Sequence, residues 1–373
     1  MKKALRLSLI VLGGLALLTA ASTMRKRGST TSMAQVIRIG AMSVDRAAHQ
    51  ATCLQDGRVL VTGGCGGNHC EAILASAELY EPSSRTFRCV ASMGTARASH
   101  AAALLPDGRV LVVGGWKDTG PTASAEVYDP ATDRWAAVPR MTEPRVSLIA
   151  VPLQDGRVLV MGGGEGRLPD QVTSEVFDPV SGSFTSLGSM RTNHYLATRM
   201  ADGRVLLTGG QGPDEAILRS AEIFDPGSGA FVPTGDMLVP RVKHAAALLG
   251  DGRILIIGGS DQRGYRARFA STEFYDPKSG RFSAGPEMHW GRHKIRDAVA
   301  ALPSGAILVA GGATHPEIFD PATESFVPVE GELSGPQMFA TATLLATGNV
   351  LVLGGYDDRT QPSASAWLIV PED

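Results

Sequence analysis

Short hydrophobic runs recur along the chain in a fixed order, and each run ends at a turn-forming pair. Between residues 97 and 141 the runs are HAAALL, RVLVVGG, SAEVYDP and WAAVPRM, separated by Pro-Asp-Gly, a polar loop and Ala-Thr-Asp. Runs of this length, rich in Val, Leu and aromatic residues and bounded by Asp-Gly or Asp-Pro, are typical of strands joined by tight hairpins. Helical periodicity is absent. The unit therefore predicts four antiparallel strands.

The same unit occurs seven times. Its Gly-Gly pair recurs 43 to 53 residues apart, beginning at Gly63, Gly114, Gly162, Gly209, Gly258, Gly311 and Gly354. A period near fifty residues indicates units that bury their apolar surfaces by stacking on neighbours. Seven four-stranded units without helices predict an all-β, seven-bladed β-propeller.

The two ends of the repeat region predict how the ring closes. Most units end with an aromatic residue followed six positions later by Met, as in Trp135 and Met141. The last unit lacks this fourth strand, whereas Val36 and Met42 have the same spacing and no preceding strands. We therefore expect the N-terminal strand to complete the C-terminal blade, which removes the unpaired sheet edges of an open array.

Composition is consistent with one large propeller domain over residues 35–373. The 373 residues are 43% hydrophobic and 19% charged, with 44 Gly and 22 Pro, as expected for a turn-rich globular chain. The formal net charge is −2, and about −5 would remain without residues 1–21. Because phosphate binding uses an excess of Lys and Arg, the sequence disfavours nucleic acid as a partner.

Residues 1–21 are typical of a signal peptide. Residues 2–6 carry three positive charges, residues 7–18 are apolar, and residues 19–21 are small enough for a cleavage site. We expect residues 22–34 to be a flexible linker and the protein to be secreted or periplasmic in a bacterium. Three basic residues at 25–27 hamper translocation, so two alternatives stay open: an uncleaved membrane anchor and a true start at Met33.

All four cysteines lie in the first unit. Cys65 and Cys70 bracket a short glycine-rich loop, and we expect them to form a disulfide in an oxidising compartment. Cys53 takes the place of Leu104 in the next unit and is expected to be a buried hydrophobic residue. Cys65, His69 and Cys70 lack a fourth ligand at the usual zinc spacing, so we predict no metal site.

The unit resembles the kelch repeat. The resemblance rests on the Gly-Gly pairs, the Tyr128-Asp129-Pro130 type of turn, the aromatic Trp135 and the step from Arg97 to His100, and it covers residues 35–373. Kelch propellers include galactose oxidase, a bacterial sialic acid mutarotase and the substrate-binding domains of ubiquitin-ligase adaptors. The resemblance therefore implies an architecture and leaves the activity open.

The predicted strand order places the candidate site on one face of the ring. The loops after each Gly-Gly and the loops from Met into the next unit share this face, whereas the opposite face receives tight turns with little room for recognition. Loops held by a rigid frame often carry binding residues. The candidate ligand-binding residues are Arg46, Arg97, Trp116, Arg145, His194, Tyr195, Arg241, His244, Arg263, Tyr265, Arg266, Arg268, Trp290, Arg292, His293 and Tyr356.

The arginines repeated at one position have two interpretations. They can offer forked donors to ligand carboxylates, or they can tie the blades together by pairing with a third-strand glutamate such as Glu126 or Glu273. Residues that break the repeat, such as Trp116, Trp290 and the loop 263–268, are better candidates for recognition because the propeller itself does not require them.

We predict a monomeric, exported kelch-type binding module that recognises a protein, peptide or glycan through this face and uses no cofactor. The alternative is a carbohydrate-processing enzyme that resembles a mutarotase or epimerase, or a galactose oxidase. The oxidase resemblance implies two Tyr, two His and a crosslinked Cys around copper, and beyond His194-Tyr195 the sequence shows no second pair. No catalytic residues are identified, and binding is favoured over catalysis.

Overall fold

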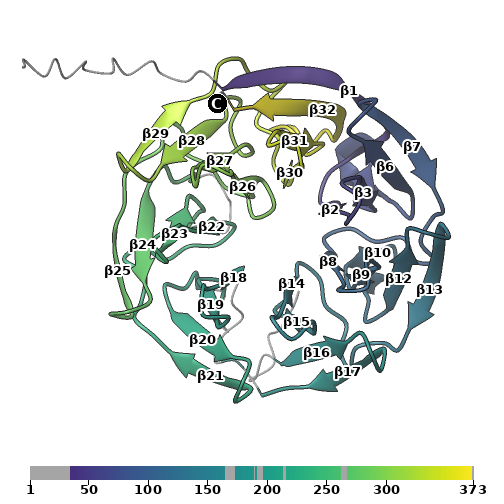
Figure 1. The fold of residues 1–373 in the computed structure, drawn as a ribbon, viewed down its shortest axis with the longest axis horizontal. Helices are drawn as coiled ribbons and strands as arrows, with labels where there is room; N and C mark the ends of the chain where they lie inside the picture. Colours follow the sequence, from purple (N-terminus) through teal and green to yellow (C-terminus); the bar gives the residue numbers. More distant parts are fainter. Residues whose placement is uncertain are drawn as a thin grey trace, which may run out of the picture. The chain divides into compact units, whose positions relative to one another are not determined.

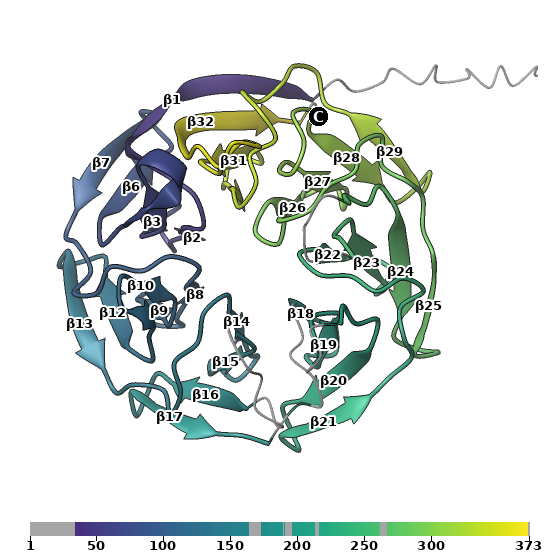
Figure 2. The same cartoon turned by 180° about the vertical axis from the view of Figure 1, so that it is seen from behind.

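Seven four-stranded antiparallel sheets follow one another around a ring (Figures 1 and 2). The computed structural model describes residues 34–163, 173–188, 190, 196–212, 216–261 and 267–371. The all-β, seven-bladed propeller predicted from the repeat is confirmed. The predicted signal peptide and all of the predicted linker except Ala34 lie outside the described residues.

Six blades are built from consecutive segments of the chain. Blade 1 contains β2 (Gln50–Cys53), β3 (Val59–Thr62), β6 (Ala77–Glu81) and β7 (Thr86–Val90), and blade 2 contains β8 (Ala101–Leu104), β9 (Val110–Val113), β12 (Ala125–Asp129) and β13 (Arg134–Val138). Blade 3 contains β14 (Ile149–Pro152), β15 (Val158–Met161), β16 (Ser174–Asp178) and β17 (Ser183–Ser186), and blade 4 contains β18 (Leu196–Arg199), β19 (Val205–Thr208), β20 (Ala221–Asp225) and β21 (Ala230–Pro233). Blade 5 contains β22 (Ala245–Leu248), β23 (Ile254–Ile257), β24 (Thr272–Asp276) and β25 (Arg281–Ala284), and blade 6 contains β26 (Val299–Ala301), β27 (Ile307–Val309), β28 (Glu317–Asp320) and β29 (Ser325–Pro328).

Blade 7 combines the two ends of the described chain. It contains β30 (Thr341–Leu344), β31 (Val350–Leu353), β32 (Ser363–Val370) and, as its outer strand, β1 (Gln35–Arg46). β1 runs antiparallel to β32, with Gln35 opposite Val370 and Ile37 opposite Leu368. The two strands lie side by side in Figure 1, in purple and yellow. The predicted closure of the ring by the N-terminal strand is thus confirmed.

Two short hairpins and one 3-10 turn stand outside the blades in the described residues. β4 (Cys65–Gly66) pairs with β5 (Ala72–Ile73) around the turn η1 (Asn68–Cys70), and β10 (Trp116–Lys117) pairs with β11 (Gly120–Pro121). Both hairpins follow a Gly-Gly pair, in blades 1 and 2. Within the described ranges, no helix has the length and hydropathy needed to cross a bilayer.

The hydrophobic core is divided into layers between adjacent blades. Alternate residues of a second strand face opposite neighbours: Val59 and Val61 of β3 pack in the cluster shared with blade 7, whereas Leu60 packs in the cluster shared with blade 2. All three are fully buried. A strand buried on both faces reads as a continuous apolar run, which explains why the second strands lack polar alternation.

The Asp-Gly turns form the hairpins expected from the sequence. In blade 2, Gly108 has φ +87°, a conformation that other residues rarely adopt, and Asp107 Oδ1 accepts the N–H of Arg109 at 3.1 Å. The innermost strands carry small residues, such as Ala101–Ala103 of β8 and Ala245–Ala247 of β22. These strands converge on the ring axis, where space is limited.

Deleting residues 35–42 should destabilise the propeller, because β32 would become an unpaired edge and blade 7 would lose its outer strand. We expect the melting temperature, measured by circular dichroism, to fall by about 10 °C or more. A control deletion of residues 22–32, in the predicted linker, should leave it unchanged. An unchanged melting temperature after the first deletion would contradict the role given to β1.

Candidate functional site

Six equivalent residues surround the mouth of the ring, on the face that carries the Gly-Gly loops. Ala48, Ser99, Ser147, Lys243, Lys294 and Phe339 come from blades 1, 2, 3, 5, 6 and 7, and all have φ between 50 and 58°. We call them the αL belt. The corresponding segment of blade 4 lies outside the described residues. A left-handed backbone at non-glycine residues is strained and persists only where its surroundings impose it.

Backbone hydrogen bonds impose this conformation. Five belt amides each donate to the carbonyl oxygen of their counterpart in the adjacent blade: Ser147 to Ser99 at 2.8 Å, Ser99 to Ala48 at 2.9 Å and Ala48 to Phe339 at 3.2 Å. Phe339 continues the chain to Lys294 at 2.9 Å, and Lys294 donates to Lys243 at 2.8 Å. The belt therefore fixes these positions around the axis.

The five repeated arginines lie inside the blades. Arg46, Arg97, Arg145, Arg241 and Arg292 are at most 2% exposed. In blade 5, Arg241 Nε donates to Glu273 Oε1 at 3.0 Å, and its Nη1 donates to the carbonyl oxygens of Gly258 and Ser271 at 2.7 and 2.9 Å. Burial lowers the pKa of Arg241, and Glu273 opposes this effect. The donors expected to bind ligand carboxylates are used within the blade.

The glutamate partner also fixes the loop that enters the blade. Glu273 accepts the N–H groups of Leu238 at 2.6 Å and Val239 at 3.2 Å, in the loop that leads from blade 4 to blade 5. The pair is repeated in four other blades: Arg46 with Glu78, Arg97 with Glu126, Arg145 with Glu175 and Arg292 with Glu317. The structure thus favours the structural interpretation of the repeated arginines.

The predicted site histidines His244 and His293 are buried as well, and so are His49 and His100. His244 Nε2 lies 2.8 Å from Thr208 Oγ1 of the preceding blade, and His49 and His100 make similar contacts with Thr341 and Thr62. Burial, with a smaller effect of Arg46, lowers the pKa of His49 to about 3. The His49 ring is therefore neutral near pH 7, and it links adjacent blades. His293 is 1% exposed, and burial with nearby cations lowers its pKa to about 3.

Cationic and aromatic side chains gather on the belt at blades 5 to 7. We call Lys243, Arg268, Lys294, Phe339, Tyr356 and Asp358 the mouth cluster. Lys294 Nζ donates to the Tyr356 hydroxyl at 2.8 Å, and the Lys243 and Lys294 ammonium groups lie 5.5 and 5.6 Å from the centre of the Phe339 ring. Arg268 forms an ion pair with Asp358. Burial and Arg268 lower the pKa of Lys294, and Asp358 opposes them.

Sequence reasoning identified Arg268 and Tyr356 but missed Lys243, Lys294 and Phe339. The signal was present: these three stand two positions after Arg241, Arg292 and Gln337, where blades 1 to 3 have small residues. Their proximity was hidden because a left-handed belt of non-glycine residues has no sequence signature.

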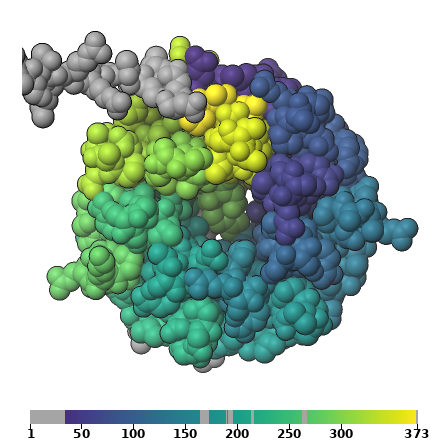
Figure 3. Space-filling model, viewed as in Figure 1, coloured from purple at the N-terminus to yellow at the C-terminus, as the bar shows by residue number. Residues whose placement is uncertain are grey.

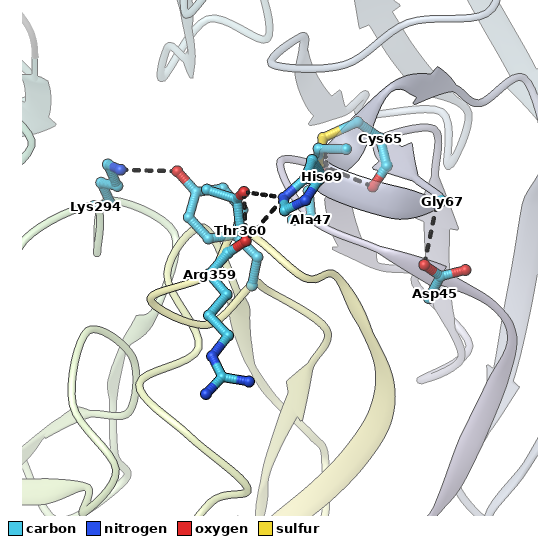
Figure 4. The surroundings of a disulfide bond; sticks show 10 residues. Asp45, Ala47, Cys65, Gly67, His69, Lys294, Arg359 and Thr360 are labelled. Atoms are coloured by element: carbon cyan, nitrogen blue, oxygen red, sulfur yellow. Dashed lines mark hydrogen bonds between the residues drawn. A yellow bond between two sulfur atoms is a disulfide. The ribbon is translucent and has the colours of Figure 1, made fainter.

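The disulfide loop of blade 1 contacts the same region. Cys65 and Cys70 form a disulfide. His69, between them, places its Nδ1 3.0 Å from the carbonyl oxygen of Arg359 and 3.1 Å from Thr360 Oγ1 in the loop of blade 7 that follows Tyr356 (Figure 4). The disulfide loop thus contacts the loop that follows Tyr356, a residue of the mouth cluster. Cys53, expected to be buried, is half-buried and has a free thiol.

The remaining predicted residues are dispersed. Trp116 is 36% exposed in the β10–β11 hairpin. Trp290 is half-buried and stacks on His315 in blade 6, with ring centres 4.9 Å apart. The described part of the chain contains no group of three or more His, Cys, Asp or Glu side chains placed to hold a metal ion. His194, Tyr195, Arg263, Tyr265 and Arg266 lie outside the described residues.

Replacing Arg241 with Ala should destabilise the protein strongly, because the buried Glu273 carboxylate would lose its charge partner. We expect the free energy of unfolding, measured by urea denaturation, to fall by about 3–5 kcal/mol. The matched control is Arg157→Ala, which breaks an exposed pair with Asp155 at 2.6 Å and should cost less than about 1 kcal/mol. Equal losses in the two variants would show that the buried pairs do not stabilise the blades.

Replacing both Cys65 and Cys70 with Ser removes the disulfide. This change should weaken the contact of His69 with Arg359 and Thr360. We expect faster amide exchange in residues 357–361, measured by mass spectrometry, and a loss of about 2 kcal/mol in stability. Cys89→Ser, at an exposed free thiol, is the control. If exchange in residues 357–361 stays at the wild-type rate, His69 does not hold this loop.

Comparisons with known proteins match three segments of the chain to a known repeat. A family model described as the kelch motif matches residues 46–94, 97–142 and 241–289. No curated protein sequence matches the chain. The chain is similar in structure to a fungal alcohol oxidase of the AA5 family in complex with copper, with a TM-score of 0.71 and 19% identity over 90% of this chain and 75% of that chain. At this identity the similarity shows the fold alone. The protein is therefore a seven-bladed β-propeller in which three segments match the kelch motif.

Proposed function

We propose that this protein is an exported binding module that captures a protein or peptide by its carboxylate groups at the mouth cluster. One observation carries the proposal: two lysines from adjacent blades, Lys243 and Lys294, lie over one aromatic ring, that of Phe339, at the rim of the ring axis. The αL belt fixes the backbone of all three.

The charges of the cluster favour an acidic ligand. Lys243, Lys294 and Arg268 contribute three positive charges, and Asp358 contributes one negative charge. Burial and, to a smaller extent, the nearby Arg268 charge lower the pKa of Lys294, since both raise the cost of keeping its ammonium group ionised. An incoming carboxylate lowers this cost. Phe339 and Tyr356 add flat apolar surface, a feature of residues that dominate binding energies at interfaces.

Export to the periplasm or the cell exterior is part of the proposal. Disulfides persist in oxidising compartments and are rare in the cytosol. The bond between Cys65 and Cys70 therefore supports export. The signal-like pattern of residues 1–21 supports the same location. A protein ligand would then be another exported or surface protein.

A second candidate function is a carbohydrate-processing enzyme, and the Lys294–Tyr356 contact favours it. An amine with a lowered pKa at 2.8 Å from a phenol supplies a base and an acid within one site. Such a pair could move protons on a sugar bound at the mouth. Exchange between sugar anomers, followed by NMR with and without the protein, would detect this activity.

The binding function is tested with the purified protein on an array of peptides and glycans. We expect acidic peptides to bind, with an affinity that falls at high salt because salt screens the attraction between the half-buried lysines and the carboxylates of the peptide. In Lys243→Gln/Lys294→Gln the affinity for these peptides should fall by about tenfold or more. Lys278→Gln, an exposed lysine in the β24–β25 turn, is the matched control and should bind normally.

Two results would overturn the proposal. One is an acidic peptide that binds the wild type and the double variant with equal affinity. The other is an array on which only glycans bind, which would show that the protein recognises glycans instead of acidic peptides.

A further inference from the structure

The ring axis holds a second candidate site, away from the mouth cluster. A cavity of about 350 Å³ runs along β14 and β18, beneath the αL belt. Its size falls within the range of small-molecule sites, about 300–1,000 Å³. Its walls include small side chains from four blades, among them Ala101, Ala150, Ala197 and Ala246, beside larger apolar residues of blades 3 and 4. The centre of the ring is visibly hollowed in the space-filling view (Figure 3).

Three polar residues lie at the end of the cavity nearer the αL belt. Arg296 of blade 6 reaches across the axis, and its Nη1 donates to the carbonyl oxygens of Ser147 and Leu148 in blade 3, both at 3.1 Å. Asp297 Oδ2 accepts Arg296 Nε at 3.4 Å and Gln50 Nε2 of blade 1 at 3.3 Å. We call Gln50, Arg296 and Asp297 the axial cap. These residues also line a narrow space together with four residues of the belt, so the cap lies between the cavity and the belt.

The other end of the cavity reaches solvent. Pro152 and Arg199 are the last residues of β14 and β18, and both line the cavity and are exposed. Arg199 donates to the Pro152 carbonyl oxygen at 3.3 Å. This end lies at the face of the tight turns, for which the sequence predicted little room for recognition. A small ligand could enter there without passing the mouth cluster.

The lining has hydrogen-bonding capacity that the described residues do not use. The carboxylate of Asp297 accepts two hydrogen bonds from described residues, both on Oδ2, and Oδ1 accepts none from them. The Thr198 hydroxyl, on the cavity wall, has no recorded hydrogen bond to a described residue. Because Arg296 and Asp297 neutralise each other, the cap offers donors and acceptors without a net charge. Alanine methyl groups face the space between the polar ends.

We propose that the axial cavity binds a small neutral polyhydroxyl molecule, a polyol or monosaccharide, that enters from the face of the tight turns. Hydroxyl groups pair with Asp297 Oδ1 at the cap and with Thr198 on the wall, and the C–H surface of the ligand packs on the alanines. A group that can both donate and accept suits the cap better than an ion, because Arg296 and Asp297 neutralise each other there. The further charged residue of the lining, Arg199, is exposed at the open end of the cavity. The site is independent of the binding function proposed for the mouth.

The test measures binding of sorbitol, myo-inositol, glucose and galactose to the full-length protein by titration calorimetry, with gluconate as the acidic counterpart. We expect at least one neutral compound to bind. Ala150→Phe fills the cavity and should abolish this binding. Thr198→Val keeps the shape of the side chain and removes one hydrogen bond, so the affinity should fall several-fold, up to about tenfold.

The mouth variant Lys243→Gln/Lys294→Gln is the control, and its polyol binding should equal that of the wild type. Loss of polyol binding in this variant would place the ligand at the mouth and overturn the axial site. Binding of gluconate alone, of none of the compounds, or of a polyol with wild-type affinity to both Ala150→Phe and Thr198→Val would also overturn it. Because Thr198→Val is isosteric, the proposal stays testable if Ala150→Phe does not fold.

Discussion

Each blade is apolar on both faces, and it can bury both only between two neighbours. The seven main core clusters lie at the seven junctions between adjacent blades, and a single strand such as β3 supplies residues to two of them. A missing or displaced blade would expose two such layers at once. Closure of the ring is therefore the constraint on which the structure depends, and the β1–β32 pairing satisfies it at the junction of the chain ends.

Closure also explains the repeated polar residues. The chain must pass from the outer strand of one blade to the inner strand of the next, and this passage leaves backbone N–H groups without strand partners. Glu273 accepts two of them, and Arg241 neutralises its charge inside the blade. A buried pair of this kind loses much solvation energy, so its recurrence in five blades reflects the need to place the loop more than a gain in stability. Residues that depart from the repeat, such as Lys294 and Phe339, do not take part in this arginine–glutamate pairing.

The sequence predicted the fold well because each part of it has a local signature. The Asp-Gly turns, the buried second strands and the unmatched strand at Val36 and Met42 specify the number of blades and the closure. The site was predicted less well. An arginine in a loop is suited equally to a ligand and to a buried glutamate, and only burial distinguishes the two roles. The belt was invisible for another reason, because Ala48, Lys294 and Phe339 share a conformation and no side-chain property.

The axial cavity shows the same limit at a larger scale. Its lining comes from six blades, and no two of the contributing segments are adjacent in the sequence. The inner strands need small residues because seven strands converge on the axis. Seven strands cannot meet at a single point, however, so some space on the axis is unavoidable. Larger apolar side chains could have filled it. Instead, a single long side chain, Arg296, crosses it and is held by two carbonyl oxygens of the opposite blade. Burying a polar side chain without hydrogen bonds costs free energy, so Arg296 must keep its hydrogen bonds at this position. The Arg296 side chain leaves the cavity open, with polar groups at both of its ends. A side chain that served only to fill the axis would not require this arrangement.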